Sequence, residues 1–335
     1  MGRTVFVTGG TGFVGSHLVE ELLNREADDV RCLVRSRPKW LDGLPVHHVQ
    51  GGLHDLDALL DGVSEADEVY HVAGLTRAPS QEQLDKANVA GTLNVLEAVR
   101  QAAPHVQRVV IVSSLAAVGP SPVEAGVVQP LDEAAPLAPI SMYGRSKATM
   151  EWAVENWRAK HPSAPPISVV RPPAVYGPRE ADIFTVIQTA SRGLFPIVGD
   201  GEAPALSLVH VRDLVRGIAD LAESPLAKGE TYFVGSEAAY SWSEIRDAVV
   251  GALGRRALTL KVPSKLVAGV GTVVEKVAGV FGQYPPLNRE KAEEARHAWI
   301  CSVDKAKRHV GYGQQVALDE GMRETVAWYR AEGWL

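Results

Sequence analysis

The chain has 335 residues, of which 46% are hydrophobic and 22% charged, and its formal net charge is -6. This composition predicts a folded protein with a large core and excludes extensive disorder, and the negative charge argues against a nucleic-acid partner. The two cysteines, Cys32 and Cys301, stand far apart in the sequence, which excludes a disulfide framework and predicts no metal site.

The N-terminus leads directly into an apolar segment, residues 4–8, without the basic and then apolar leader of a signal peptide. No uninterrupted apolar run reaches the length of a transmembrane helix, and the nearest, residues 266–281, is broken by glycines and by Glu275 and Lys276. We therefore expect a cytoplasmic protein with no integral membrane segment. Two interpretations of residues 266–281 stay open: a packed helix that caps the fold, or a segment that lines a hydrophobic substrate pocket or touches a membrane surface.

Short β-branched apolar runs alternate with helix-like stretches through the first half of the chain. The expected strands are residues 4–8, 30–34, 68–72, 108–113 and 168–170, and the expected helices include residues 14–24 and 88–101. Strands that alternate with helices form βαβ units and therefore a parallel sheet. The sequence predicts an α/β fold with a doubly wound parallel sheet of the Rossmann type.

The pattern becomes less regular after Pro178. Strands are expected at residues 232–234 and 258–262, helices at residues 241–253 and 289–298, and an ordered loop at residues 120–139. We expect residues 1–178 to form the dinucleotide-binding domain, with residues 205–235 returning to it. Residues 179–204 and 236–335 are expected to form mainly a smaller C-terminal lobe that binds the substrate.

A glycine-rich segment, TGGTGFVG, runs from Thr8 to Gly15 between the first predicted strand and the first predicted helix. Gly9 permits a tight turn, Gly12 lets the backbone approach a pyrophosphate, and Gly15 allows the helix to pack closely on the strand. The helix N-terminus then offers free N–H groups and a partial positive charge to the phosphates. A glycine turn without a ligand is the alternative, but the strand and helix on either side favour a dinucleotide-binding loop.

The second predicted strand is followed by Arg35, with Arg37 and Lys39 close behind. An NAD-binding protein would place an acidic residue there to hold the ribose hydroxyls. A guanidinium group instead suits a ribose phosphate, which it can hold through two hydrogen bonds. We therefore favour NADP as the cofactor, with NAD as the alternative. A solvated basic loop is the other interpretation of this segment.

Tyr143 and Lys147 lie four residues apart in the segment YGRSK, which places them on one face of a helix. An ammonium group beside a phenol favours the phenolate, so we expect Lys147 to lower the pKa of Tyr143. Upstream, the strand at residues 108–113 is followed by Ser114, and a hydroxyl at the carboxyl end of such a strand lies in the ligand crevice. A tyrosine and a lysine at this spacing are common on helices. Together with the serine and the glycine loop, however, they indicate carbonyl chemistry on a bound dinucleotide.

The chain resembles the extended short-chain dehydrogenases/reductases, also called the NAD-dependent epimerase/dehydratase family, over nearly its whole length. Within the family it is nearest the branch of dihydroflavonol reductases and hydroxysteroid-dehydrogenase-like proteins. The motifs that carry the resemblance are TGGTGFVG, HVAG at residues 71–74, NVAGT at 88–92, SS at 113–114, YGRSK at 143–147, RPPAVYGP at 171–178 and LVHVRD at 208–213.

The resemblance implies functions for individual residues. Ser114 corresponds to the catalytic serine, Tyr143 to the general acid/base, and Lys147 to the lysine that holds the nicotinamide ribose and tunes the tyrosine. The implied cofactor contacts are Gly9, Gly12, Phe13 and Val14 at the pyrophosphate, Leu53 by the adenine, Ala73 and Gly74 along the adenosine, and Pro173 to Val175 near the carboxamide. One departure is Gly52, where the family often has an acidic residue for the adenine amino group. Asn88 is expected to be mainly structural.

We therefore expect an NADP-dependent oxidoreductase that transfers a hydride between nicotinamide and a carbonyl or secondary alcohol of a small, hydrophobic substrate. One alternative is a nucleotide-sugar epimerase with tightly bound NAD, which usually has an acidic strand end where this chain has Arg35. Another is a non-catalytic NADP-binding sensor or scaffold, whose Tyr/Lys pair is commonly lost but is intact here. Relatives commonly pair helices like those at residues 88–101 and 143–158 across a two-fold axis, so a homodimer is a further expectation. The sequence does not identify the substrate.

Overall fold

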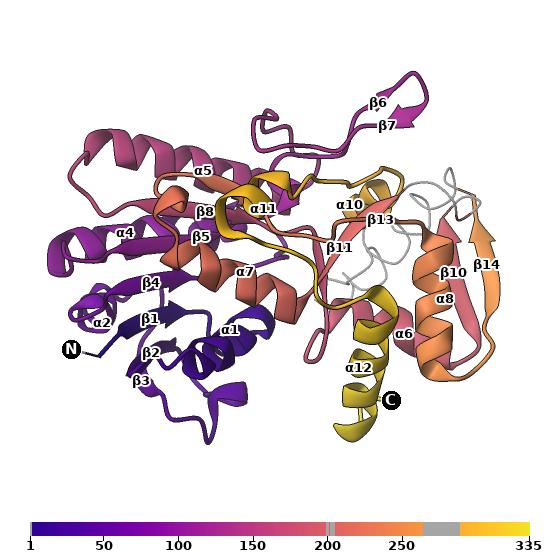
Figure 1. Cartoon of the computed structure of the whole chain (residues 1–335), viewed down its shortest axis with the longest axis horizontal. Helices are drawn as coiled ribbons and strands as arrows, with labels where there is room; N and C mark the ends of the chain where they lie inside the picture. The colour runs from indigo at the N-terminus through magenta and orange to yellow at the C-terminus, as the bar shows by residue number, and fades with distance from the viewer. Residues whose placement is uncertain (1, 199–200, 202–204, 264–288) are drawn as a thin grey trace.

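The computed structural model describes residues 2–198, 201, 205–263 and 289–335. Its centre is a seven-stranded, wholly parallel sheet in the order β12-β8-β5-β4-β1-β2-β3 (Figure 1). The strands are β1 (Thr4–Thr8), β2 (Asp29–Val34), β3 (His47–Gln50), β4 (Glu68–His71), β5 (Arg108–Val112), β8 (Ile167–Arg171) and β12 (Thr231–Phe233). From β1 the chain adds strands outward on both sides, β2 and β3 on one and β4, β5, β8 and β12 on the other, which is the doubly wound topology. The predicted Rossmann-type α/β fold is confirmed.

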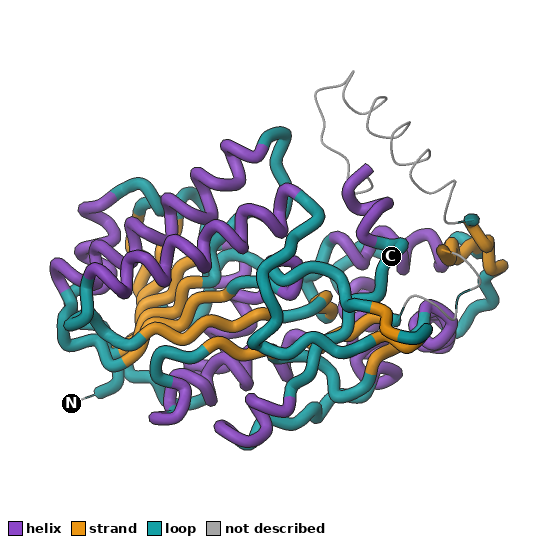
Figure 2. Tube along the Cα trace, turned by 90° about the horizontal axis from the view of Figure 1, so that it is seen from above, coloured by secondary structure: helices purple, strands orange, loops and turns teal. Residues whose placement is uncertain are grey.

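Helices cover both faces of this sheet (Figure 2). One face packs against α1 (Phe13–Asn24), α7 (Val211–Glu223) and α11 (Asp304–Val310), and the other against α2 (Leu56–Val63), α4 (Gly91–Ala102) and α5 (Met142–Lys160). In β1, Val5 and Val7 are buried in the first core and Phe6 in the second. A strand buried on both faces is apolar without alternation, which explains the continuous apolar runs in the sequence.

The remaining elements lie beyond the carboxyl ends of the central strands (Figure 1). They include a three-stranded sheet with the order β13-β11-β9 and a parallel pair of strands, β10 and β14. Their bounds are β9 (Ala174–Tyr176), β10 (Leu194–Val198), β11 (Leu206–His210), β13 (Ala239–Tyr240), β14 (Leu258–Val262), α6 (Asp182–Ser191), α8 (Trp242–Leu253), α10 (Arg289–Glu294) and α12 (Leu318–Ala331). A separate core, with Phe195, Ile197, Val249 and Met322 among its members, holds α6, α8 and α12 together. The division into a dinucleotide-binding domain and a substrate-binding lobe remains our proposal.

Three local predictions differ from the structure. Residues 120–139, predicted as a loop, contain a small hairpin of β6 (Val123–Glu124) and β7 (Val127–Val128), whose turn places Ala125 and Gly126 at positive φ. The helix predicted from residue 88 is α-helical only from Gly91, because it follows α3 (Gln81–Asp85) through a π-helical turn, η2 (Lys86–Ala90). The helix predicted at residues 289–298 ends at Glu294.

Both interpretations of residues 266–281 fall outside the described residues. Among the helices that are described, none is long and apolar enough to cross a membrane.

Candidate active site

The glycine loop between β1 and α1 combines a turn at positive φ with a close approach of the helix to the turn. Gly9 adopts a φ of +79°, and a Cβ there would lie 2.5 Å from the backbone nitrogen of Ala73. A Cβ at Gly15 would lie 2.1 Å from the carbonyl oxygen of Gly9, so only glycine lets the helix approach the turn this closely. Gly12 is the N-cap of α1, whose first turn, from Phe13, has no side-chain cap and no acidic residue. Its N–H groups and positive dipole end therefore suit the phosphates of a dinucleotide.

The other predicted site residues follow the carboxyl ends of neighbouring strands. In the order of the sheet they are Leu53 after β3, Arg35 after β2, Ala73 and Gly74 after β4, Ser114 after β5, and Pro173 after β8, with Val175 just beyond in β9. The glycine loop follows β1, where the winding direction changes. The carboxyl edge of a doubly wound sheet at this switch point is where such folds bind ligands. The chain therefore brings the predicted residues together along one edge.

Arg35 is exposed at the end of β2. Its Cγ and Cδ atoms lie 3.9 Å from the position of a Cβ on Gly52, and its carbonyl oxygen accepts a hydrogen bond of 3.0 Å from Gln50 Nε2. The hydrogen bond fixes the backbone of Arg35, and the stem of its side chain runs near Gly52. Within the described part of the chain, no carboxylate forms a salt bridge with its guanidinium group, which leaves this group available to an anionic ligand.

Ser114 and Tyr143 are brought together by close packing of two helical turns. Ser114 is the N-cap of the 3-10 turn η3 (Leu115–Ala117), and its Oγ accepts a hydrogen bond of 3.1 Å from the backbone nitrogen of Ala116. Tyr143 lies in the first turn of α5, close enough to Ser114 for the serine side chain to lower the pKa of the phenol. A Cβ at Gly144 would lie 2.4 Å from the carbonyl oxygen of Ala116. The glycine of the YGRSK motif therefore allows α5 to approach η3.

Lys147 lies one turn further along α5 and is buried. Its Nζ donates a hydrogen bond of 2.9 Å to the carbonyl oxygen of Val112, the last residue of β5. A Cβ on Gly74 would lie 3.4 Å from the same Nζ. The ammonium group is therefore placed between the ends of β4 and β5, on the same edge as the glycine loop.

The expectation that Lys147 lowers the pKa of Tyr143 is wrong for the protein by itself. Burial raises the pKa of Tyr143 to about 12, and the Ser114 side chain opposes this rise only in part. Burial likewise lowers the pKa of Lys147 to about 8, against the opposing charge of Glu151. The ammonium group is directed to the Val112 carbonyl, so desolvation decides the pKa of the phenol. Tyr143 is therefore protonated at neutral pH, as a proton donor must be.

A buried ion pair beneath the site was not predicted. Glu151 accepts a hydrogen bond of 2.6 Å from Arg171 Nη2 and two of 3.1 Å from its Nε, and it also accepts one from Ser113 Oγ. Both charged side chains are only 7% exposed. Glu151 stands four residues after Lys147, so the helical spacing that links Tyr143 to Lys147 could have identified it.

Asn88, in the π-helical turn, connects three parts of the site. Its Nδ2 donates to Ser146 Oγ at 2.8 Å and to the carbonyl oxygen of Leu75 at 2.9 Å, and its Oδ1 accepts from the backbone nitrogen of Leu75 at 2.8 Å. These bonds hold the loop after β4 against α5. This geometry agrees with the structural function expected of Asn88.

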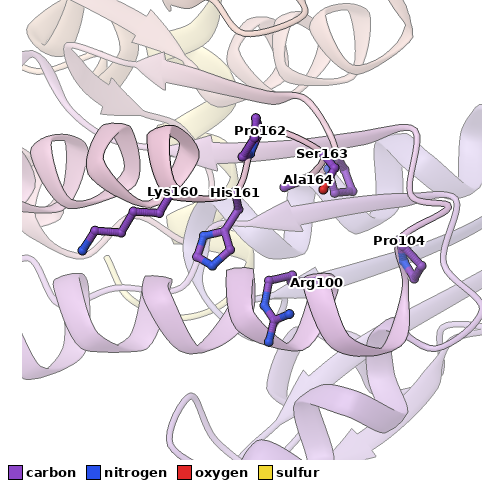
Figure 3. A pocket seen from close by; sticks show the side chains of 8 residues that line it. Arg100, Pro104, Lys160, His161, Pro162, Ser163 and Ala164 are labelled. Carbon is purple, nitrogen blue, oxygen red and sulfur yellow. The ribbon is translucent and has the colours of Figure 1, made fainter.

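A surface hollow lies far from these residues (Figure 3). It is found where α4 and α5 end and is lined by Arg100, Pro104, Lys160, His161, Pro162, Ser163, Ala164 and Pro165. Tyr143 and Lys160 stand near opposite ends of α5, about 25 Å apart at the usual helical rise. The hollow is therefore not part of the candidate active site.

The fold and the glycine loop define a class of proteins, the enzymes that bind a nicotinamide dinucleotide at the edge of a Rossmann sheet. The model of the NAD dependent epimerase/dehydratase family matches residues 5–235, and the chain belongs to this family of extended short-chain dehydrogenases/reductases.

Two of its relatives are named as reductases. A ceramide reductase of Caulobacter vibrioides (strain NA1000 / CB15N) is 31% identical over 99% of this chain and 96% of its own length. A putative dihydroflavonol 4-reductase of Synechocystis sp. is 28% identical over 100% of this chain and 97% of its own length. Among solved structures, that of gox2253 has a TM-score of 0.81 at 29% identity and covers 99% of both chains. The chain is thus an NAD(P)-dependent enzyme near the predicted branch of the family.

Proposed function

We propose that this enzyme reduces a carbonyl group of an apolar, lipid-like substrate with NADPH in the cytosol. The proposal is carried by the neighbouring side chains of Ser114 and Tyr143, one helical turn from the buried Lys147, at the edge that carries the glycine loop. The similarity to a ceramide reductase supports an apolar substrate. A homodimer also remains a prediction, which sedimentation equilibrium would test.

The residues at this edge fit a nicotinamide dinucleotide in the order of its parts. In the proposed arrangement Leu53 lies by the adenine, Arg35 holds the ribose phosphate, Gly9, Gly12, Phe13, Val14 and Gly15 hold the pyrophosphate, Ala73 and Gly74 line the adenosine side, Lys147 binds the nicotinamide ribose, and Pro173 and Val175 lie near the carboxamide. When bound, the nicotinamide supplies the hydride for reduction or accepts it in the reverse direction.

The remaining chemistry belongs to the protein. Ser114 donates a hydrogen bond to the carbonyl oxygen of the substrate and fixes its position. Tyr143 then donates its proton to that oxygen as negative charge develops on it. Lys147, on the same face of α5 as Tyr143, holds the nicotinamide ribose. Glu151 acts indirectly, because its negative charge favours the charged form of Lys147.

A substrate screen tests the proposal. Purified enzyme would be given NADPH with long-chain ketones, aldehydes and nucleotide sugars, and oxidation of the cofactor would be followed by its absorbance. We expect consumption of NADPH with an apolar ketone or aldehyde, and none by the matched variant Tyr143→Phe. Interconversion of nucleotide sugars without net use of NADPH would instead establish an epimerase. Cofactor binding with no turnover of any substrate class would favour a sensor.

A further inference from the structure

The strand pair β10 and β14 lies at the end of the molecule away from the N-terminus (Figure 1). Along β10 the side chains alternate between the two sides of the pair. Phe195 and Ile197 are buried in the core formed with α6, α8 and α12, whereas Leu194 and Pro196 are exposed. One side of the pair is therefore an inner face and the other an outer face.

The outer face is apolar. Leu258 pairs in register with Leu194, and Leu260 pairs with Pro196, so these four side chains share one face of the two strands. Leu258 is 70% exposed, Leu260 53% and Leu194 46%. Each is among the most exposed large hydrophobic residues described, and together they form one patch, which we call the β10–β14 face. An exposed contiguous apolar patch marks an interaction surface.

Basic residues flank one end of this patch. Arg192 precedes β10, and Arg255 and Arg256 precede the parallel strand β14, all of them exposed. Lys261 is exposed too, but it pairs with Ile197 and therefore lies on the other side of the strands. Residues 192–198 and 254–263 contain no aspartate or glutamate. Within the described residues, the side chains of Arg192, Arg255, Arg256 and Lys261 form a single hydrogen bond, a long one of 3.5 Å from Arg255 Nη1 to the carbonyl oxygen of Ser191. The three arginines, without acidic neighbours in sequence, stand out in a chain whose net charge is -6.

The charge pattern distinguishes between partners. A second copy of the chain, packed through this face about a two-fold axis, would bring the three arginines of one copy near those of the other. An anionic lipid surface instead offers negative headgroups to the basic residues and an apolar boundary to the leucines. We propose that the β10–β14 face docks the enzyme on an anionic bilayer surface. This goes beyond the proposed reaction, and binding through this face does not depend on which substrate is reduced.

Vesicle sedimentation with the full chain tests the proposal. Vesicles of phosphatidylcholine alone would be compared with vesicles that also contain phosphatidylserine, at low and high salt. We expect the wild type to bind the anionic vesicles and to be released by salt. Arg255→Glu/Arg256→Glu should weaken binding by about tenfold or more, because each cation near an anionic surface contributes on the order of fivefold. Leu258→Gln/Leu260→Gln should also weaken it by about tenfold, since two apolar side chains no longer enter the interface.

The matched control exchanges the same number of charges elsewhere. Lys160 and Lys228 are exposed outside the β10–β14 face, so Lys160→Glu/Lys228→Glu should retain most of the binding. All of these positions are exposed, and unchanged thermal unfolding would show that the variants fold. Equal binding by the control and the arginine variant would overturn the assignment of the face. So would a leucine variant that binds as well as the wild type, or face variants that change only the oligomeric state in sedimentation equilibrium.

Discussion

Replacing Arg35 should change the choice of cofactor without disturbing the fold. The side chain is exposed, its stem runs near Gly52, and no carboxylate in the described part of the chain forms a salt bridge with its guanidinium group. A charge-assisted hydrogen bond to a phosphate contributes about 1.5–3 kcal/mol. Solvent screening at an exposed site favours the lower end of that range. Arg35→Ala should therefore weaken NADPH binding by about tenfold and leave NADH binding almost unchanged.

Arg35→Asp should reverse the preference, because a carboxylate repels the ribose phosphate and accepts hydrogen bonds from the free ribose hydroxyls. The assay is a set of paired dissociation constants for NADPH and NADH on the wild type and both variants. Arg100→Ala, at the distant hollow, is the control and should change neither constant. A wild type that binds NADH as tightly as NADPH would refute the reasoning. The epimerase alternative would then be the better explanation of the site.

Three further predictions concern the framework of the site. Glu151→Gln leaves the buried Arg171 without its counter-ion and should lower the free energy of unfolding, measured in urea, by about 3–5 kcal/mol. The control Glu155→Gln, in an exposed pair with Arg158, should lower it by less than about 1 kcal/mol. Equal effects of the two variants would contradict the burial of the Glu151–Arg171 pair. Gly15→Ala places a Cβ 2.1 Å from a backbone carbonyl oxygen and should abolish cofactor binding or stable folding, and normal binding and melting would exclude this packing. Burial, with a smaller effect of Lys147, lowers the pKa of His71 from 6.5 to about 3. The contribution of His71 to the free energy of unfolding is therefore complete above pH 6.5 and should fall by about 3 kcal/mol between pH 7 and pH 4. Unfolding measured at both pH values should show a smaller loss for His71→Asn, and an unchanged loss would contradict the prediction.

Strands β1, β4, β5 and β8 of the central sheet were predictable because they are buried on both faces. The continuous apolar run of β1 was placed at Thr4–Thr8, as the structure has it. The turn at Gly9 was predictable because its positive φ, and the close approach of the backbone at Gly15, can be adopted at these two positions by few residues other than glycine. The π-helical turn at Lys86–Ala90 was not, because its hydrogen-bond pattern has no periodic signal of its own in the apolar residues.

The site shows where local spacing stops being informative. The interval between Tyr143 and Lys147 identifies a shared helix face, but it does not give the burial that raises the pKa of the phenol. The ion pair of Glu151 with Arg171 joins a helix to a strand 20 residues further along the chain. The helix spacing indicates Glu151, whereas its pairing with Arg171 depends on how α5 packs on the sheet. Such pairings follow from tertiary structure and not from any local pattern.

Hydride transfer in the presence and absence of the Tyr143 hydroxyl tests the central claim most directly. Wild-type enzyme and Tyr143→Phe would each be mixed in a single turnover with NADPH deuterated at the transferable position and an apolar ketone accepted by the wild type. The account predicts an alcohol with one deuterium on the former carbonyl carbon, and a loss of at least about hundredfold in rate for the variant with NADPH binding almost unchanged. A product without deuterium, or a variant that retains most of the rate, would contradict it.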